Sequence, residues 1–153
     1  MAVMNRGGLA AAMAGLVIIG AGVVGCLIAR LAGRLPGCTV QLVDVNPRRE
    51  TIAHHLGVRF ALPEQAEGER DCVIHASGSP AGLATALGLA GFEATVVEAS
   101  WFGARSVSLP LGEAFHSQRL TIQSSQVGHI AAAQRRRWDQ RRRMATVMAL
   151  LDD

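Results

Sequence analysis

Apolar residues along the chain form short continuous runs that alternate with longer segments of mixed character. The runs at 16–20, 39–44, 72–77 and 94–100 are rich in branched side chains, which is typical of strands buried on both faces of a parallel sheet. A helix with Asn46 as its N-cap residue follows the second run. Strand and helix alternate almost throughout, so we predict an α/β fold: a doubly wound parallel sheet with helices on both faces, in three layers α/β/α.

Weaker signals complete this prediction. We expect shorter strands at 58–62, 106–111 and 120–125. The segment 130–151 contains neither Gly nor Pro and is predicted as a C-terminal helix, and residues 1–14 are predicted as a helical lead-in. No linker rich in Pro, Gly or Ser interrupts the chain, so all 153 residues are expected to form a single domain.

A membrane-spanning helix is the main alternative for the first apolar segment. From Leu9 to Ala29 the chain has 21 residues without a charge, enough to cross a bilayer of about 30 Å at ~1.5 Å per residue. Four glycines lie inside this run and arginines flank it on both sides, so the charge pattern sets no orientation. A small membrane-anchored protein is therefore an open alternative, although the strand–helix alternation favours a domain with no membrane partner.

The charged residues argue against a nucleic-acid partner. The net charge of +3 depends on six arginines at 135–143, outside which nine Arg and eleven acidic residues leave −2. Clustered arginines beside Trp138 suit base stacking. A solvated helix face with Trp138, Met144 and Val147 packed inward is the simpler interpretation. Three cysteines without CxxC spacing predict neither a disulfide framework nor a metal site, which favours a reducing, cytoplasmic compartment.

The chemistry of the chain is indicated by "GAGVVG" at 20–25, a GxGxxG pattern between an apolar strand and a helix. This context is the one in which the pattern binds a dinucleotide. Gly20 is expected to make the tight turn and Gly22 to let the backbone approach a pyrophosphate. Gly25 is expected to let the helix pack closely on the sheet.

Further residues extend the predicted dinucleotide site. Backbone N–H groups of Val23 and Val24 at the helix start can donate to phosphate oxygens. Asp44 comes 19 residues after the last glycine of the motif, at the end of the next predicted strand. Its carboxylate can accept hydrogen bonds from the adenosine ribose and repels a 2′-phosphate, so NAD is favoured over NADP. Arg48 and Arg49 weaken that preference, because an arginine there can hold the 2′-phosphate.

Four motifs in this order resemble the nucleotide-binding half of the zinc-type medium-chain dehydrogenases, the relatives of alcohol and threonine dehydrogenase. They are "GLVIIGAGVVG", "VDVNPRR", "DCVIHASGSPAGLATAL" and "GFEATVVEASWFG". The resemblance implies a Rossmann fold with strand order 3-2-1-4-5-6, NAD(H) as the cofactor, and an oxidoreductase that transfers a hydride between NAD and an alcohol or carbonyl substrate.

The resemblance also implies roles for residues outside the glycine motif. Arg49 matches the basic residue that contacts the adenosine ribose. Ala76 and Ser77 match the loop that passes the cofactor, and Ala99 and Ser100 match the segment near the nicotinamide carboxamide. Family members often pair through the sheet edge of this domain, which implies a homodimer formed at 120–124.

The chain departs from the family pattern where catalysis is concerned. Only 14 residues precede Gly15, whereas family members carry there the domain with the zinc ligands and the substrate pocket. We therefore expect no catalytic residue and no zinc site in this chain, and catalysis only with a catalytic half that is separate or lost. A non-catalytic nucleotide-binding module, or a degenerate remnant, is the alternative function.

Overall fold

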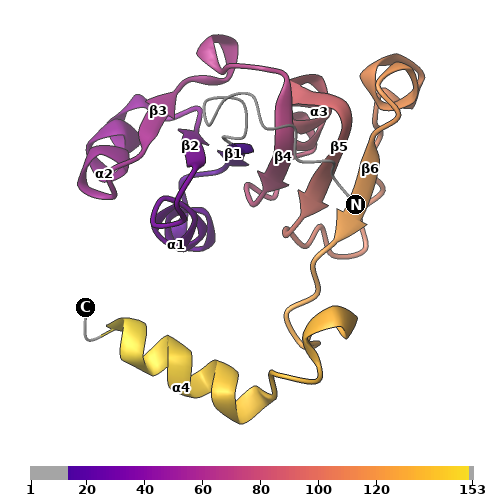
Figure 1. The fold of residues 1–153 in the computed structure, drawn as a ribbon. Coiled ribbons are helices and arrows are strands. Elements are labelled where there is room, and N and C mark those ends of the chain that lie inside the picture. Colours follow the sequence, from indigo (N-terminus) through magenta and orange to yellow (C-terminus); the bar gives the residue numbers. More distant parts are fainter. Residues whose placement is uncertain (1–13, 152–153) are drawn as a thin grey trace, which may run out of the picture.

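The computed structural model describes residues 14–151, and its centre is a six-stranded sheet (Figure 1). All five strand pairs are parallel and the strand order is β3-β2-β1-β4-β5-β6. The strands are β1 (Ala14–Ile19), β2 (Cys38–Val43), β3 (Arg59–Ala61), β4 (Arg70–His75), β5 (Ala90–Glu98) and β6 (Thr121–Ser124). This order confirms the predicted doubly wound Rossmann fold, with the two short predicted strands at 58–62 and 120–125 as its edges.

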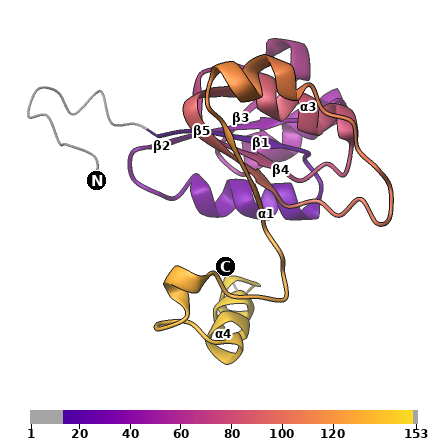
Figure 2. The same cartoon turned by 90° about the vertical axis from the view of Figure 1, so that its right-hand side faces the viewer.

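Helices cover the sheet on both sides (Figure 2). The longer helices are α1 (Val23–Ala32), α2 (Glu50–His55), α3 (Pro80–Leu89) and α4 (Gln140–Leu151). Short helical turns are η1 (Pro47–Arg49), η2 (Pro63–Gln65), η3 (Leu111–Phe115) and η4 (Ala132–Gln134). Figure 2 shows α1 and α3 on opposite faces of the sheet, as a three-layer α/β/α arrangement requires.

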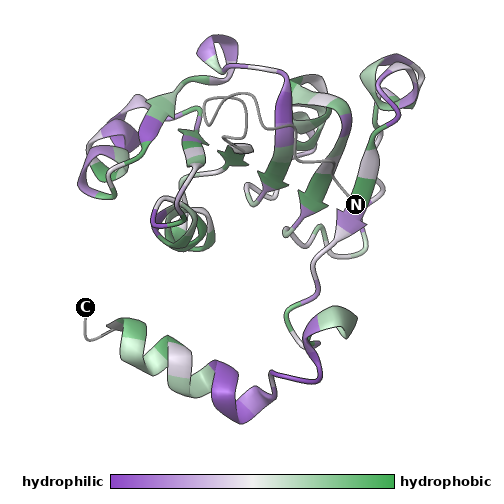
Figure 3. Ribbon diagram, viewed as in Figure 1, coloured by the Kyte–Doolittle hydropathy of each residue, from purple (hydrophilic) through white to green (hydrophobic). Residues whose placement is uncertain are grey.

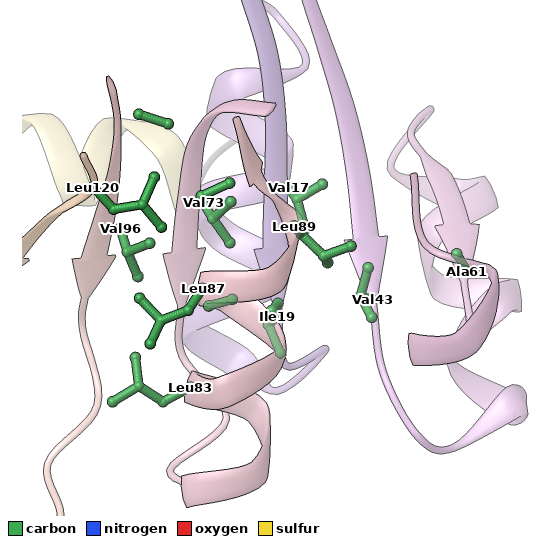
Figure 4. Packing of buried hydrophobic residues seen from close by; sticks show 13 residues of the cluster. Val17, Ile19, Val43, Ala61, Val73, Leu83, Leu87, Leu89, Val96 and Leu120 are labelled. Atoms are coloured by element: carbon green, nitrogen blue, oxygen red, sulfur yellow. The ribbon is translucent and has the colours of Figure 1, made fainter. Parts of the chain in front are cut away.

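Two apolar clusters hold these layers together, one on each face of the sheet. β1 contributes to both clusters, because neighbouring residues of a strand point to opposite faces. Val17 and Ile19 of β1 pack with Leu83 and Leu87 of α3 on one face (Figure 4). Ile18, which lies between them, belongs to the other cluster, with residues of α1 and α2. The central strands are hydrophobic along most of their length (Figure 3). Burial of both faces explains why β1 has a continuous apolar run.

From residue 14 onward, the apolar segment that resembled a membrane span is a strand, a turn and a helix. β1 ends at Ile19 and α1 begins at Val23, so the two elements divide the run between them. Within residues 14–151, no helix is both long enough and apolar enough to cross a bilayer.

Some predicted elements differ in the structure. The strand predicted at 106–111 is absent, because Pro110 has no N–H for a ladder and the chain turns there into η3. The helix predicted at 130–151 begins only at Gln140, where the side chain of Asp139 accepts a hydrogen bond from Arg142 N at 2.7 Å and caps the first turn. The lead-in helix predicted at 1–14 falls on residues outside the described range, apart from Ala14, which belongs to β1.

The C-terminal segment stands apart from the sheet. Figures 1 and 2 show α4 separated from the helices and strands of the domain. Met144, Val147 and Met148 are exposed, so the expectation that this stripe packs inward is wrong. The arginines at the start of α4 form its hydrophilic end (Figure 3), and Arg142 lies over the Trp138 ring at 4.5 Å.

Candidate functional site

A cavity of about 520 Å³ opens at the carboxyl ends of β1, β2 and β4. The strand order reverses between β1 and β4, and ligands of open α/β sheets bind at such a reversal. Its lining includes six of the eleven residues predicted for the cofactor: Gly20, Gly22, Asp44, Arg49, Ala76 and Ser77. The other lining residues are Ile19, Val43, Val45, Asn46, Pro63, Ser79, Ala81, Gly82 and Thr85.

The three glycines of the motif differ in what surrounds them. Gly20 has φ +106°, and a Cβ there would lie 2.8 Å from the backbone N of Ser77. At Gly25 a Cβ would lie 1.8 Å from the carbonyl oxygen of Gly20, so only glycine lets α1 approach the end of β1. Gly22 has no atom within 4 Å of the corresponding position. Gly20 and Gly25 thus allow close packing within the protein, whereas Gly22 leaves open space at the cavity.

The beginning of α1 supplies backbone donors near this space. Its first backbone hydrogen bond runs from Cys26 N to Gly22 O at 2.9 Å. The N–H groups of Val23, Val24 and Gly25 therefore precede the hydrogen-bonded ladder of the helix. No acidic side chain belongs to this first turn, so α1 itself supplies no carboxylate that would neutralise the positive end of its dipole. The side chains of Val23 and Val24 are exposed and do not line the cavity.

Asp44 connects the end of β2 to the glycine loop. Its Oδ2 accepts a hydrogen bond from Ala21 N at 2.7 Å, and its Oδ1 accepts one from Asn46 N at 2.9 Å. Asn46 in turn accepts from Arg48 N at 3.1 Å, which confirms it as the cap of the following turn. A carboxylate oxygen accepts more than one hydrogen bond, so Asp44 can still accept donors from the cavity that it lines.

Arg49 lines the same cavity as Asp44. The thiol of Cys26 records both charges: burial raises its pKa most, the positive charge of Arg49 lowers it, and the negative charge of Asp44 raises it. The thiol also contacts the carbonyl oxygen of Ala21 at 3.5 Å. The negative charge of Asp44 and the positive charge of Arg49, both predicted ribose contacts, therefore act on a thiol that contacts the glycine loop.

The opposite side of the cavity follows the ends of β4 and β5. Ala76 N donates to Ile19 O at 2.8 Å and so continues the pairing between β1 and β4. Ser77 lines the cavity and is exposed. Ala99 and Ser100 do not line it. Ser100 instead accepts a hydrogen bond from Gly78 N at 3.0 Å and thereby fixes the loop after β4.

A buried histidine, which the sequence predicts only as a hydrogen-bonded core residue, lies directly beneath this loop. The His75 side chain is fully buried. Its Nδ1 lies 2.7 Å from Glu98 Oε2 and its Nε2 lies 2.6 Å from Ser77 Oγ. The histidine prediction is confirmed, but its partner Glu98 was missed, because Glu98 is 23 residues away and meets His75 only through the pairing of β4 with β5.

No clusters suited to metal binding occur in the part of the chain that the structure describes: residues 14–151 hold no group of three or more His, Cys, Asp or Glu in suitable positions. Cys26, Cys38 and Cys72 are all free thiols. Burial, and secondarily the negative charge of Asp71, raises the pKa of the Cys72 thiol. The polar groups at the cavity are backbone N–H donors, hydroxyls, the guanidinium of Arg49, the amide of Asn46 and one carboxylate acceptor, a set suited to phosphate and sugar groups.

Comparison with known proteins gives matches among solved structures. No protein-family model and no curated protein matches the sequence. Alcohol dehydrogenase TADH from Thermus sp. ATN1 is 26% identical, with a TM-score of 0.64 over 74% of this chain and 36% of that protein. L-Idonate 5-dehydrogenase from Escherichia coli is 22% identical, with a TM-score of 0.64 over 76% of this chain and 36% of that protein.

A third match was solved with a cofactor. It is a short chain alcohol dehydrogenase from Escherichia coli complexed with NADH, 19% identical, with a TM-score of 0.65 over 76% of this chain and 37% of that protein. The chain thus spans little more than a third of the length of the proteins that it matches. Its fold is that of the nucleotide-binding half of the zinc-type medium-chain alcohol and polyol dehydrogenases, as the sequence motifs predicted.

Proposed function

We propose that this chain binds a nicotinamide adenine dinucleotide, as the nucleotide-binding part of an alcohol-type dehydrogenase. The observation that carries the proposal is the open space at Gly22, where no atom lies within 4 Å of a Cβ position. Gly22 lines the cavity together with Asp44, and the first amides of α1 follow it directly in the chain. Amides at a helix start suit a pyrophosphate, and a carboxylate suits ribose hydroxyls.

The residues of the first side of the cavity have separate roles in this proposal. The amides of Val23 and Val24 donate to the pyrophosphate, and Asp44 accepts from the adenosine ribose. A 2′-phosphate would bring negative charge toward Asp44, so NAD is preferred to NADP. Arg49 contacts the same ribose and reduces this preference. The net preference depends on the carboxylate, because its position is fixed by two backbone N–H donors.

The second side of the cavity is assigned to the nicotinamide half of the ligand. Ala76 and Ser77 border the cavity there, and Ala99 and Ser100 support the neighbouring loop. When bound, the nicotinamide ring exchanges a hydride with an alcohol or carbonyl substrate. The group that polarises this substrate is assigned to a separate catalytic part. Oxidoreductase activity, a cytoplasmic location and pairing of two copies through β6 are further parts of the proposal.

Titration calorimetry with NAD, NADH and NADP tests the binding step. The unmodified chain should bind NAD more tightly than NADP. Asp44→Ala should weaken NAD roughly 10–100-fold, the effect of losing hydrogen bonds to a charged group, and NADP much less. Asp44→Asn keeps an acceptor for Ala21 N and should lower the preference for NAD without loosening the loop.

A matched control is Asp71→Ala. Asp71 also accepts a hydrogen bond from a backbone amide, Gly15 N at 2.6 Å, but at the far end of β1. This variant should bind NAD as the unmodified chain does. Absence of binding of all three dinucleotides at millimolar concentration would contradict the proposal. Equal losses of NAD and NADP in Asp44→Ala would contradict the assignment of Asp44 to the ribose.

A further inference from the structure

Three side chains connect the surface of the cavity with the interior of the sheet. Ser77 is an exposed residue of the cavity lining, and its Oγ lies 2.6 Å from His75 Nε2. His75 Nδ1 lies 2.7 Å from Glu98 Oε2. The other oxygen of Glu98 accepts a hydrogen bond from Ser100 N at 2.6 Å, which holds the carboxylate in place. The hydroxyl of Ser77, the imidazole of His75 and the carboxylate of Glu98 thus form a continuous chain of hydrogen bonds.

The direction of these hydrogen bonds follows from the chemistry of the groups. An ionised carboxylate only accepts, so the proton of a neutral imidazole is on Nδ1. Nε2 then has no proton and must accept from the hydroxyl of Ser77. The backbone N–H of Ser79 also donates to Ser77 Oγ, at 3.2 Å. The Ser77 proton is therefore directed at a base, and a lone pair of Oγ is left for the cavity.

The packing around the imidazole keeps this geometry. The ring is stacked on Phe102, with centroids 6.0 Å apart and an interplanar angle of 15°. On α3, a Cβ at Gly82 would lie 2.4 Å from Ser77 Oγ and 2.9 Å from His75 Nε2. With any larger residue at this position, the side chains of Ser77 and His75 would have to move. If α3 did not contact Ser77 and His75, any helix-forming residue could occupy position 82.

We propose that Ser77, His75 and Glu98 form a nucleophile, its base and the carboxylate that positions the base. A nucleophile within hydrogen-bond reach of a base, with the base oriented by a third group, is the recognised arrangement for acyl transfer. Ser77 Oγ attacks the carbonyl carbon of a small activated ester or a thioester, forming an Oγ–C bond. The bond to the leaving group breaks, and the Ser77 proton moves to His75 Nε2.

The start of α3 provides donors for the oxyanion of this step. The helix ladder begins with Leu83 N, which donates to Ser79 O at 3.1 Å. The amides of Ala81 and Gly82 precede that bond, and both residues line the cavity that contains Ser77. Backbone amides without helical partners at a helix start stabilise developing negative charge. The acyl donor therefore meets a nucleophile and amide donors in one cavity.

Burial of His75 determines which substrates react and how far the reaction goes. His75 is 0% exposed, and Nε2 is covered by Ser77 and α3. The imidazole cannot reach a departing group to protonate it, so the leaving group must depart as an anion. An aryl oxide or a thiolate can do so. Once Ser77 carries the acyl group, water cannot reach Nε2 as its base, so the acyl-serine accumulates.

Ser77 shares a cavity with the proposed dinucleotide, but its acylation does not depend on dinucleotide binding. Ser77 lies in the lining together with Gly22 and Asp44. If a dinucleotide binds as proposed, it covers Ser77 and slows acylation. If NAD does not slow acylation, the role proposed for Ser77 stands, and the proposal that the dinucleotide binds in the same cavity is contradicted. The two proposals can therefore fail separately.

The test is the reaction of the full chain with p-nitrophenyl acetate, followed by absorbance and peptide mass spectrometry. We expect a burst close to one equivalent of p-nitrophenolate per chain, slow turnover afterwards, and an acetyl group on Ser77. Ser77→Ala should lose the burst. Ser117→Ala is the control: it removes an exposed hydroxyl that donates to Glu113 O at 3.1 Å and does not line the cavity, and it should keep the burst.

Glu98→Gln tests the positioning role of the carboxylate. It should slow the burst at least 100-fold, the lower end of the contribution of a general base, while the final amount of acetyl-Ser77 stays near one equivalent. A structural role alone would not separate rate from amount in this way. No acetyl group on Ser77, equal bursts from Ser77→Ala and the unmodified chain, or an unchanged rate in Glu98→Gln would each overturn the proposal. If Glu98→Gln does not fold, the two serine variants still decide it.

Discussion

The two sides of the cavity are built in different ways. On the side of β1 and β2, the contacts involve the backbone. Gly20 and Gly25 let neighbouring backbone segments approach closely, and the carboxylate of Asp44 accepts a hydrogen bond from the backbone N–H of Ala21. On the side of β4 and β5, side chains contact one another, and His75 joins Ser77 to Glu98. A site made by the backbone leaves a spaced glycine pattern in the sequence. A site made by side chains from different strands leaves no such pattern.

Glycines lie on both sides of the cavity, and the atoms that an added Cβ would meet can be compared between them. Gly25 faces a backbone carbonyl that cannot move without the strand, whereas Gly82 faces the side-chain atoms of Ser77 and His75. Side chains can rotate away at moderate cost, but a backbone oxygen of the central strand cannot. Substitution of Gly25 should therefore disturb the fold, and substitution of Gly82 should disturb the geometry of the site.

The largest effect is expected for Gly25→Ala. The added Cβ would lie 1.8 Å from the carbonyl oxygen of Gly20, so α1 must move away from the sheet. We expect a loss of roughly 3 kcal/mol or more in the free energy of unfolding, at or above the usual range for overpacking. Urea denaturation followed by circular dichroism measures it.

Gly22→Ala is the matched control for this prediction. No atom lies within 4 Å of its added Cβ, so the free energy of unfolding should change by less than about 1 kcal/mol. The same methyl group occupies the space proposed for the ligand, so NAD binding should weaken while the fold persists. Equal destabilisation by Gly22→Ala and Gly25→Ala would contradict the separation of structural and ligand-facing glycines.

A smaller effect is expected for Gly82→Ala on the second side. Its Cβ would displace Ser77 Oγ, 2.4 Å away, and disturb the bond to His75. We expect a loss of about 1–3 kcal/mol, because side chains give way before the backbone does. Gly88→Ala is the control in the same helix: nothing lies within 4 Å of its added Cβ, and alanine in a helix should stabilise the chain by ~0.5–1 kcal/mol. Thermal unfolding of the two variants should shift in opposite directions.

The difference between the two sides also sets how much the sequence could predict. The sheet and the first side were predicted from local patterns, since the strand ending at Ile19, the glycines at 20–25 and Asp44 follow one another at regular spacing. Ser77 was predicted through the family resemblance alone. Glu98 was missed because its partner is His75, on a neighbouring strand, and only the register of β4 with β5 brings them together.

The errors in the C-terminal half have a related cause. Absence of Gly and Pro predicted a helix from residue 130, but the start at Gln140 depends on one cap by Asp139. An apolar stripe such as Met144 and Val147 indicates a face to be buried, yet both residues are exposed. Periodicity identifies an apolar face correctly and does not say whether another part of the chain covers it.

The smallest effect concerns the charges on the first side, and the Cys26 thiol can report it. The positive charge of Arg49 lowers its pKa and the negative charge of Asp44 raises it, with burial the largest cause of a pKa above the ordinary value. Asp44→Asn should therefore lower the pKa of Cys26, because the thiolate no longer meets a negative neighbour. Arg49→Gln should raise it. The rate of alkylation by iodoacetamide as a function of pH measures both shifts, since only the thiolate reacts.

Cys72 is the internal control for these two variants. Its thiol lies on β4, and its pKa is raised by burial, Asp71 and Cys38, none of which changes. The alkylation profile of Cys26 should move to lower pH in Asp44→Asn and to higher pH in Arg49→Gln, while that of Cys72 stays in place. Movement of both thiols together would mean that the variants loosen the sheet as a whole. Movement of Cys26 alone, in opposite directions, would show that Asp44 and Arg49 set the electrostatic potential at the glycine loop, where the proposed dinucleotide binds.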